Sequence, residues 1–322
     1  TLSGDSGGDL DLTVTGYCDV TGTLALNTST VSVAALRTNS GAAVTQDATG
    51  TLALATGSNF GGSEGATYAW RNTDGTSDIN LGGTLTNTGG SYFEPRTAPD
   101  YASVVNNVVW DNTAYWVGKM TFGGTLVVNV HKGMQTYNGS KDCIVNGDVT
   151  LNGQLQALGN NVNNMTFKSL TINNTGTYEA TSGTTTITSR TGGTGTYALE
   201  NNGTFTHNNG TVAITDADNV VSLGLDSSLY NLELSGGSKK IRNNTTINNN
   251  LTLTSGDLYG HSGSLTLDVK GQTILNGGTT GQNIAFTGTM NWGSVTVNSG
   301  TLKLSSGTNN AESFRNVGGT IQ

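Results

Sequence analysis

Apolar residues recur two positions apart in short segments along most of the chain. In the stretch NLELSGGSKKIRNNTTINNNLTLTSGDL, residues 231–258, Leu232 and Leu234 form one such pair, Leu251 and Leu253 form another, and both pairs run into Ser-Gly turns. Side chains two apart on a strand point to the same face, so each segment predicts a short strand with one buried face and one wetter face. The same device recurs in SLTINN (169–174), SLTLDV (264–269), SVTVNSG (294–300) and TLKLSSG (301–307).

Such short strands contribute two or three inward side chains each, which cannot enclose a core unless neighbouring repeats stack. Apolar pairs begin at residues 212, 232, 251, 265 and 284, in steps of 20, 19, 14 and 19. These steps predict coils of two or three strands with variable turns. An antiparallel β-sandwich is the alternative, but the runs that flank the Asn-Gly pairs are short for hairpins. We therefore expect an all-β fold, a parallel β-helix or β-solenoid with an inserted aromatic-rich β-unit.

The chain divides by composition into three sections. Residues 1–57 carry the repeat and form an N-terminal solenoid-like section, and residues 144–322 form the longest repeat section. Residues 58–143 hold both prolines and three of the four tryptophans, which indicates an inserted or capping β-unit. Its aromatic residues either form the core of this unit or provide a surface that stacks on a sugar or another ligand. The candidate ligand-binding residues are Tyr92, Trp110, Tyr115 and Trp116.

Asparagine is frequent just outside the expected strands, for example at 208–209 and 248–250. Asn tolerates the left-handed backbone conformation and bonds to its own backbone, so it suits the tight corners of a coil. Equivalent Asn residues in stacked coils are also expected to form ladders of amide hydrogen bonds.

The two cysteines coincide when YCDVTGTLAL (17–26) is laid on DCIVNGDVTL (142–151). Cys18 and Cys143 then share the parity of the inward residues, which favours free, buried thiols over a disulfide between them. Two cysteines without CxxC spacing do not predict a zinc site.

Residues that could carry catalysis are sparse. His131, His207 and His261 are far apart, and the Asp-x-Asp pairs are Asp9/Asp11 and Asp216/Asp218. The second pair lies in DADN, a weak calcium candidate because the Gly-rich setting of calcium-binding β-rolls is missing. The sequence shows no nucleophile elbow, P-loop or dinucleotide motif. We predict no catalytic residue, no metal site and no cofactor.

Charge and composition limit which classes of partner the sequence predicts. The formal net charge is −8 and Gly accounts for 47 of 322 residues. Abundant Gly, Thr and Asn disfavour helices, and the absence of a basic run gives no electrostatic footprint for nucleic acid. Lys239, Lys240 and Arg242 are the densest positive spot, which we interpret as a solvated turn. No apolar run is long enough to span a membrane. The chain opens at Thr1 rather than Met, so it is a processed chain or a fragment, and export stays possible.

The pattern of residues 231–258 resembles the low-complexity β-solenoid repeats of phage virion and tail-fibre proteins and of bacterial surface adhesins. The resemblance covers 144–322 well, 1–57 loosely and 58–143 not at all. It implies a fold and a setting but assigns no site residue. The expected function is a non-enzymatic structural or adhesive fibre or appendage subunit of a virion. A bacterial or archaeal cell-surface filament or adhesin and a polysaccharide-degrading β-helix enzyme are the alternatives. We expect a virion or extracellular location, a homo-oligomer (a trimer or an axial assembly) and a cell-surface glycan or receptor as partner.

Overall fold

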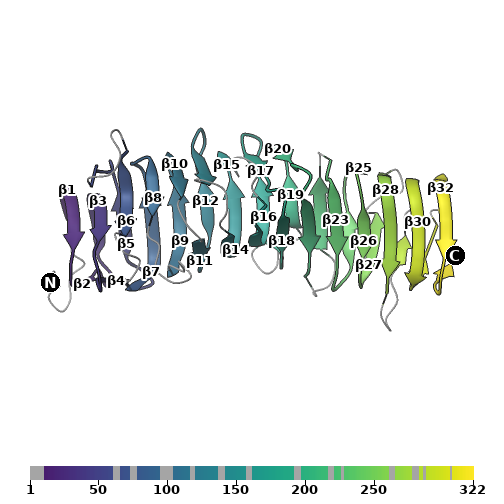
Figure 1. Ribbon diagram of the computed structural model, residues 1–322, viewed down its shortest axis with the longest axis horizontal. Coiled ribbons are helices and arrows are strands. Elements are labelled where there is room, and N and C mark those ends of the chain that lie inside the picture. The colour runs from purple at the N-terminus through teal and green to yellow at the C-terminus, as the bar shows by residue number, and fades with distance from the viewer. Residues whose placement is uncertain are drawn as a thin grey trace. The chain divides into compact units, whose positions relative to one another are not determined.

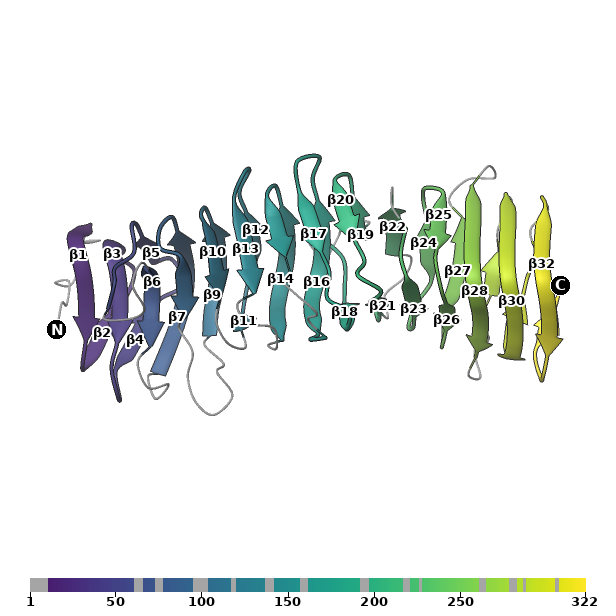
Figure 2. The ribbon, with the colours of Figure 1, turned by 45° about the horizontal axis from the view of Figure 1, so that its top comes forward.

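A computed structural model describes residues 11–60, 66–72, 78–94, 104–116, 120–136, 142–156, 162–191, 197–216, 221–225, 228–260, 265–277, 283–285, 288–304 and 307–322. In these residues the chain forms strands and no helix (Figures 1 and 2), and every described ladder between strands is parallel. This confirms the predicted all-β solenoid. The chain divides into two compact units, Thr1–Asn163 and Asn164–Gln322, which we call unit 1 and unit 2.

Unit 1 is built from short strands that return to the same place once per coil. Its strands are β1 Leu12–Val20, β2 Thr23–Ala25, β3 Thr30–Thr38, β4 Ala43–Gln46, β5 Thr51–Leu54, β6 Tyr68–Asn72, β7 Asp78–Asn87, β8 Tyr92–Glu94, β9 Val104–Trp110, β10 Thr113–Trp116, β11 Met120–Phe122, β12 Leu126–Val128, β13 Gly133–Thr136, β14 Cys143–Leu151 and β15 Gln154–Gln156. One inner column of side chains in register consists of Val31, Leu52, Leu85, Val108, Leu126 and Val149. Stacking therefore builds the continuous apolar core that a single coil lacks.

The aromatic-rich segment forms parallel coils of the same kind. Strand β6 pairs with β3, and β11 pairs with β14. Its large side chains fill the interior: Trp70, Trp110, Trp116, Phe93 and Phe122 are all buried. The Trp110 Nε1 donates a hydrogen bond of 3.1 Å to the Gly133 carbonyl, which satisfies its one polar group. The structure thus uses these aromatics as core, and the division at residues 57 and 143 stays a prediction.

Unit 2 continues with strands of similar length. They are β16 Met165–Ile172, β17 Thr177–Glu179, β18 Thr184–Ile187, β19 Tyr197–Asn201, β20 Thr204–Thr206, β21 Thr211–Ile214, β22 Val221–Leu225, β23 Asn231–Leu234, β24 Lys239–Ile241, β25 Thr245–Ile247, β26 Leu251–Leu253, β27 Asp257–Gly260, β28 Thr266–Asn276, β29 Asn283–Ala285, β30 Thr289–Ser299, β31 Thr301–Leu302, β32 Asn309–Asn316 and β33 Thr320–Ile321. Strands β28, β30 and β32 follow one another in register (Figure 2).

The irregular step of 14 residues in the sequence pattern has a simple origin. Leu251 pairs with Thr273, whereas Leu267 of the next apolar segment pairs with Thr245 on another face of the coil. The apolar pairs at residues 251 and 265 therefore belong to different columns. One true column consists of Val212, Leu232, Leu251, Thr273 and Val295, in steps of 20, 19, 22 and 22 residues. The single strand β28 thus supplies residues to two columns, through Leu267 and through Thr273.

Asparagines occupy corners and form ladders, as predicted. Asn208 and Asn209 have φ angles of 45° and 61°, which few other side chains adopt without strain. The Asn249 Nδ2 donates to Asn231 Oδ1 at 2.9 Å on the preceding coil. Side-chain amides therefore add hydrogen bonds between coils beside the backbone ladders.

Candidate functional site

Three tyrosines of unit 1 stack on the outer face of successive coils. Tyr68 of β6 pairs in register with Tyr92 of β8, and Tyr92 pairs with Tyr115 of β10. The ring centroids are 5.4 Å apart for the first pair and 5.6 Å for the second, with interplanar angles of 33° and 28°. Strands β8 and β10 are labelled in Figure 1. The backbone ladder thus holds three rings in a row.

The geometry of the row leaves ring surface available. Rings in face-to-face contact would be closer, so a centroid separation above 5 Å with a tilt of about 30° describes slipped rings. Each of the three tyrosines is half-buried rather than covered. The row therefore combines flat apolar surface with phenolic hydroxyl groups.

Polar side chains extend the row at both ends. Tyr115 is in register with Gln135, and Gln135 with Gln156, and the Gln135 Nε2 donates to Gln156 Oε1 at 2.9 Å. At the other end, the Arg71 guanidinium lies 4.8 Å from the centre of the Tyr68 ring, a cation–π distance. We call Tyr68, Tyr92, Tyr115, Gln135 and Gln156 the tyrosine strip.

The strip has the composition of a surface that binds saccharides. Aromatic rings stack on the apolar faces of flat ligands, and their hydroxyl groups form hydrogen bonds. The amides of the two glutamines supply both donors and acceptors. These groups can recognise a ligand by stacking and by hydrogen bonding.

The structure separates the four predicted ligand-binding residues into two pairs. Tyr92 and Tyr115 lie together in the strip, whereas Trp110 and Trp116 are 0% and 1% exposed and pack inside the coils. The two tryptophans present no ring face to solvent because each takes the inward position of its strand. Ligand binding itself stays a prediction, and it now rests on the tyrosines.

Sequence reasoning missed Tyr68, Gln135 and Gln156. A signal for the tyrosine was present: Tyr-Phe at 92–93 and Tyr-Trp at 115–116 each place an aromatic on both faces of a strand. The equivalent Tyr-Ala-Trp at 68–70 is one residue longer, because β6 has a register shift between Tyr68 and Trp70. The glutamines became visible only through the register of β13 and β15.

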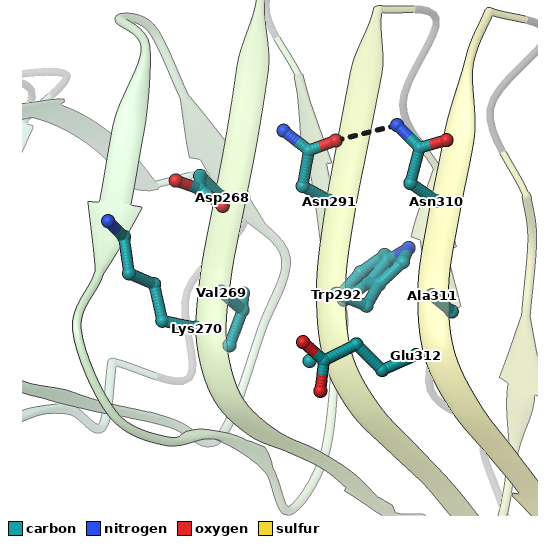
Figure 3. A pocket seen from close by; sticks show the side chains of 9 residues that line it. Asp268, Val269, Lys270, Asn291, Trp292, Asn310, Ala311 and Glu312 are labelled. Atoms are coloured by element: carbon teal, nitrogen blue, oxygen red, sulfur yellow. Dashed lines mark hydrogen bonds between the residues drawn. The ribbon is translucent and has the colours of Figure 1, made fainter.

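Unit 2 contains a hollow of about 460 Å³ along strands β28, β30 and β32 (Figure 3). Figure 3 shows Asp268 and Lys270 by β28 and Asn310 by β32, with Asn291 between them. The Asn310 Nδ2 donates to Asn291 Oδ1 at 2.9 Å. The two carboxylates that line the hollow, Asp268 and Glu312, are two coils and two residues apart, about 12 Å at the backbone.

The other candidate residues do not gather. His131 is exposed in a turn with a φ of 60°, and the His207 ring lies 5.5 Å from that of Tyr230. His261, Asp9 and residues 217–219 of the DADN segment lie outside the described residues. Among the residues that the structure does describe, no group of three or more His, Cys, Asp or Glu side chains could hold a metal ion.

Both cysteines are free thiols, as predicted. Cys143 is fully buried, and this burial, followed by the nearby Asp142, raises the pKa of its thiol to about 12. Cys18 is half-buried, and burial, followed by Asp19, raises its pKa less far. Neither thiol has the lowered pKa of a nucleophile.

The basic spot at 239–242 is not a solvated turn, so that interpretation was wrong. Lys239 and Lys240 begin strand β24, and Lys239 takes an inward position at 1% exposure. Its Nζ donates hydrogen bonds to the carbonyls of Asp216 (2.8 Å) and Gly237 (2.6 Å). Burial lowers the pKa of Lys239 to about 8, against the opposing effect of the Asp216 charge.

Comparisons of the chain with models of protein families, with curated protein sequences and with solved structures found no match. The described residues also contain no helix that is long and apolar enough to cross a lipid bilayer. The tyrosine strip is therefore characterised by its own geometry.

Proposed function

We propose that this chain is a non-enzymatic structural and adhesive subunit of a virion fibre or appendage, and that the tyrosine strip contacts a cell-surface glycan. The row of Tyr68, Tyr92 and Tyr115 on the outer face of in-register coils carries this proposal. Three partly exposed aromatic rings in a row are not needed for the core, which the inward aromatics already fill. They favour a surface that binds a ligand.

The solenoid supports the structural half of the proposal. Each coil contacts only its neighbours, so a solenoid gains length by adding coils without enlarging its core. A subunit that spaces or projects a binding surface can use such a scaffold. We also propose that copies of the chain associate, as a trimer or along an axis, since several weak glycan contacts then act together.

Binding is tested with the purified chain and a panel of neutral polysaccharides by affinity electrophoresis, followed by calorimetry on any that bind. The test variant carries Tyr92→Ala and Tyr115→Ala. The matched control is Thr113→Ala, because Thr113 is exposed on the same face of β10. We expect the double variant to lose binding and the control to keep it. Binding that is equal in both, or absent from the unsubstituted chain, contradicts the adhesive role.

The setting is tested separately by electron microscopy of the native particle that contains the chain. Density for this solenoid in a fibre on a capsid or tail supports the virion proposal. A free filament in which the chain repeats would support the surface-appendage alternative. Hydrolysis of any polysaccharide in the panel, detected as new reducing ends, would overturn the non-enzymatic assignment.

A further inference from the structure

A second outward-facing cluster lies in unit 2 and combines aromatic rings with cations. Tyr197 of β19, Ser222 of β22, Lys240 of β24 and Tyr259 of β27 occupy one register position on four successive coils. Arg242 follows Lys240 by two residues. We call Tyr197, Lys240, Arg242 and Tyr259 the cationic patch.

The two cations of the patch are held against its rings. The Arg242 guanidinium lies 4.9 Å from the centre of the Tyr197 ring, and its Nη1 donates a hydrogen bond of 2.5 Å to the Tyr197 hydroxyl. The Lys240 Nζ lies 5.8 Å from the centre of the Tyr259 ring. These contacts reduce the freedom of both long side chains before any ligand arrives.

Strand alternation makes this pair of charges face outward. Lys239 and Ile241 are 1% and 0% exposed, while Lys240 and Arg242 are half-buried on the opposite face. The Cα atoms of Lys240 and Arg242 lie about 7 Å apart along the chain, and their charged groups lie against rings on different coils. Neither forms an ion pair with another residue that the structure describes. A chain with a net charge of −8 thus presents two organised cations that have no partner acid among the residues described by the structure.

The surroundings of the patch limit the kind of anion that fits. Asp257 lies near Tyr259, where its charge adds to the effect of burial in raising the pKa of the phenol. Its carboxylate accepts a hydrogen bond of 3.4 Å from the Ser238 hydroxyl. A densely charged polyanion would meet this carboxylate as well as the two cations. A ligand with separated anionic groups and many hydroxyl groups could place its anions at the two cations and a hydroxyl group at the Asp257 carboxylate.

We propose that the cationic patch binds an acidic saccharide, one that carries carboxylate or sulfate groups. The Arg242 guanidinium suits an oxyanion because its planar fork can donate two parallel hydrogen bonds, and Lys240 adds a point charge. The rings of Tyr197 and Tyr259 flank the cations and contact the sugar rings. The choice of a surface glycan as partner class rests on the proposed adhesive function, but the site itself is separate from the tyrosine strip.

The test measures binding of the full chain to polygalacturonate and to dextran sulfate of low sulfate content, whose anionic groups are well separated, with unmodified dextran as the neutral probe. The variant Lys240→Ala with Arg242→Ala is compared with Lys270→Ala, which removes an exposed cation from β28 of the same unit. We expect at least one acidic probe to bind, with about tenfold or greater loss in the double variant and little change in the control. Binding should weaken as salt rises, and this salt dependence should be smaller in the double variant.

The variant Arg242→Lys distinguishes the contribution of the guanidinium's paired hydrogen bonds from that of its positive charge. It keeps the positive charge but cannot form the paired hydrogen bonds, so its affinity should fall between those of the unsubstituted chain and the double variant. Thermal unfolding of each variant verifies that the coils are intact. The preference between the two acidic probes then identifies carboxylate or sulfate as the recognised group.

Three results would overturn the proposal: no binding to either acidic probe, equal binding to dextran, or equal losses in the double variant and the control. A single-stranded DNA oligonucleotide that binds the patch more tightly than both saccharides would also overturn it, in favour of a general polyanion site. Failure at this site is distinguishable from failure of the tyrosine strip. The strip is tested with neutral saccharides and with substitutions in unit 1 only.

Discussion

Tyr115 and Trp116 are consecutive residues of β10, yet one stacks on Tyr92 at the surface and the other is 1% exposed inside the coil. The alternation of a strand places one side chain at the surface and the next in the core. Substitutions at the two positions should therefore have different effects.

We expect Trp116→Ala to lower the free energy of unfolding by about 3–5 kcal/mol, because it leaves a cavity in the core. Tyr115→Ala removes a half-buried ring and should lower the free energy of unfolding by less than Trp116→Ala does. The lost stacking with Tyr92 contributes about 1 kcal/mol or less, in addition to the effect of the lost apolar contact area. Denaturant titration followed by circular dichroism measures both. Equal destabilisation by the two variants would contradict the assignment of inner and outer faces.

Close approach of neighbouring coils makes Gly147 hard to replace. A Cβ added at Gly147 would lie 2.4 Å from the carbonyl oxygen of Gly124 on the adjacent coil, and a backbone atom cannot move aside cheaply. We expect Gly147→Ala to lower the free energy of unfolding by about 1–3 kcal/mol.

Gly133→Ala is the matched control for this substitution. The nearest atom to a Cβ at Gly133 is Thr113 Cγ2 at 3.4 Å, an ordinary contact. Because alanine restricts the unfolded chain, this variant should be neutral or gain up to about 1 kcal/mol. A loss as large as that of Gly147→Ala would show that strand propensity, rather than the approach of the coils, sets the effect.

Buried Lys239 should make stability depend on pH. The pKa is about 8 in the folded chain and near 10.5 when unfolded, so between these values the unfolded chain binds the extra proton. The free energy of unfolding therefore rises with pH in this window, by about 2 kcal/mol from pH 7.5 to 9.5. Below pH 8 the folded chain holds a buried charge.

The variant Lys239→Met isolates this contribution, since methionine does not titrate and has a similar length. Other groups, including both thiols, titrate equally in the two proteins and cancel in the difference. The difference in unfolding free energy, unsubstituted chain minus variant, should increase between pH 7.5 and 9.5. A difference that is flat or falls with pH would show that the Lys239 ammonium is not desolvated.

The two thiols should differ in reactivity. At pH 8, iodoacetamide should modify Cys18 slowly and leave Cys143 unmodified, because burial excludes the reagent and raises the pKa of both thiols, most for Cys143. Peptide mass spectrometry identifies the modified residue. Both cysteines should react once denaturant is added, and rapid modification of Cys143 without denaturant would contradict its placement.

Alternation, repeated in short segments along the chain, favoured a solenoid, because the spacing of Leu232 and Leu234 already assigns them to one face. The same rule could have placed Trp116 inside and Tyr115 outside. Alternation does not predict the register between coils, because this register depends on the lengths of the turns, which vary. The pairing of Leu251 with Thr273, the meeting of Tyr68 with Tyr92 and the reach of Arg242 to Tyr197 all depend on that register.

Lys239 illustrates a second limit. Lys239 is two residues from the inward Ile241, so alternation predicts an inward position, whereas a lysine side chain is usually exposed to solvent. Two backbone carbonyls accept hydrogen bonds from its ammonium group, and the sequence pattern does not predict these bonds. Tertiary hydrogen bonds overrode the preference of the residue.

The ladders between successive coils also determine how the molecule responds to force. In unit 2 the inner column advances by 19 to 22 residues from one coil to the next between Val212 and Val295. A pull that detaches one coil frees about 20 residues, which extend to roughly 70 Å of contour length. Tension on unit 2 would therefore release chain length in increments of similar size. A solenoid built in this way can lengthen under load by unfolding coils at one end while the remaining coils stay hydrogen-bonded to one another.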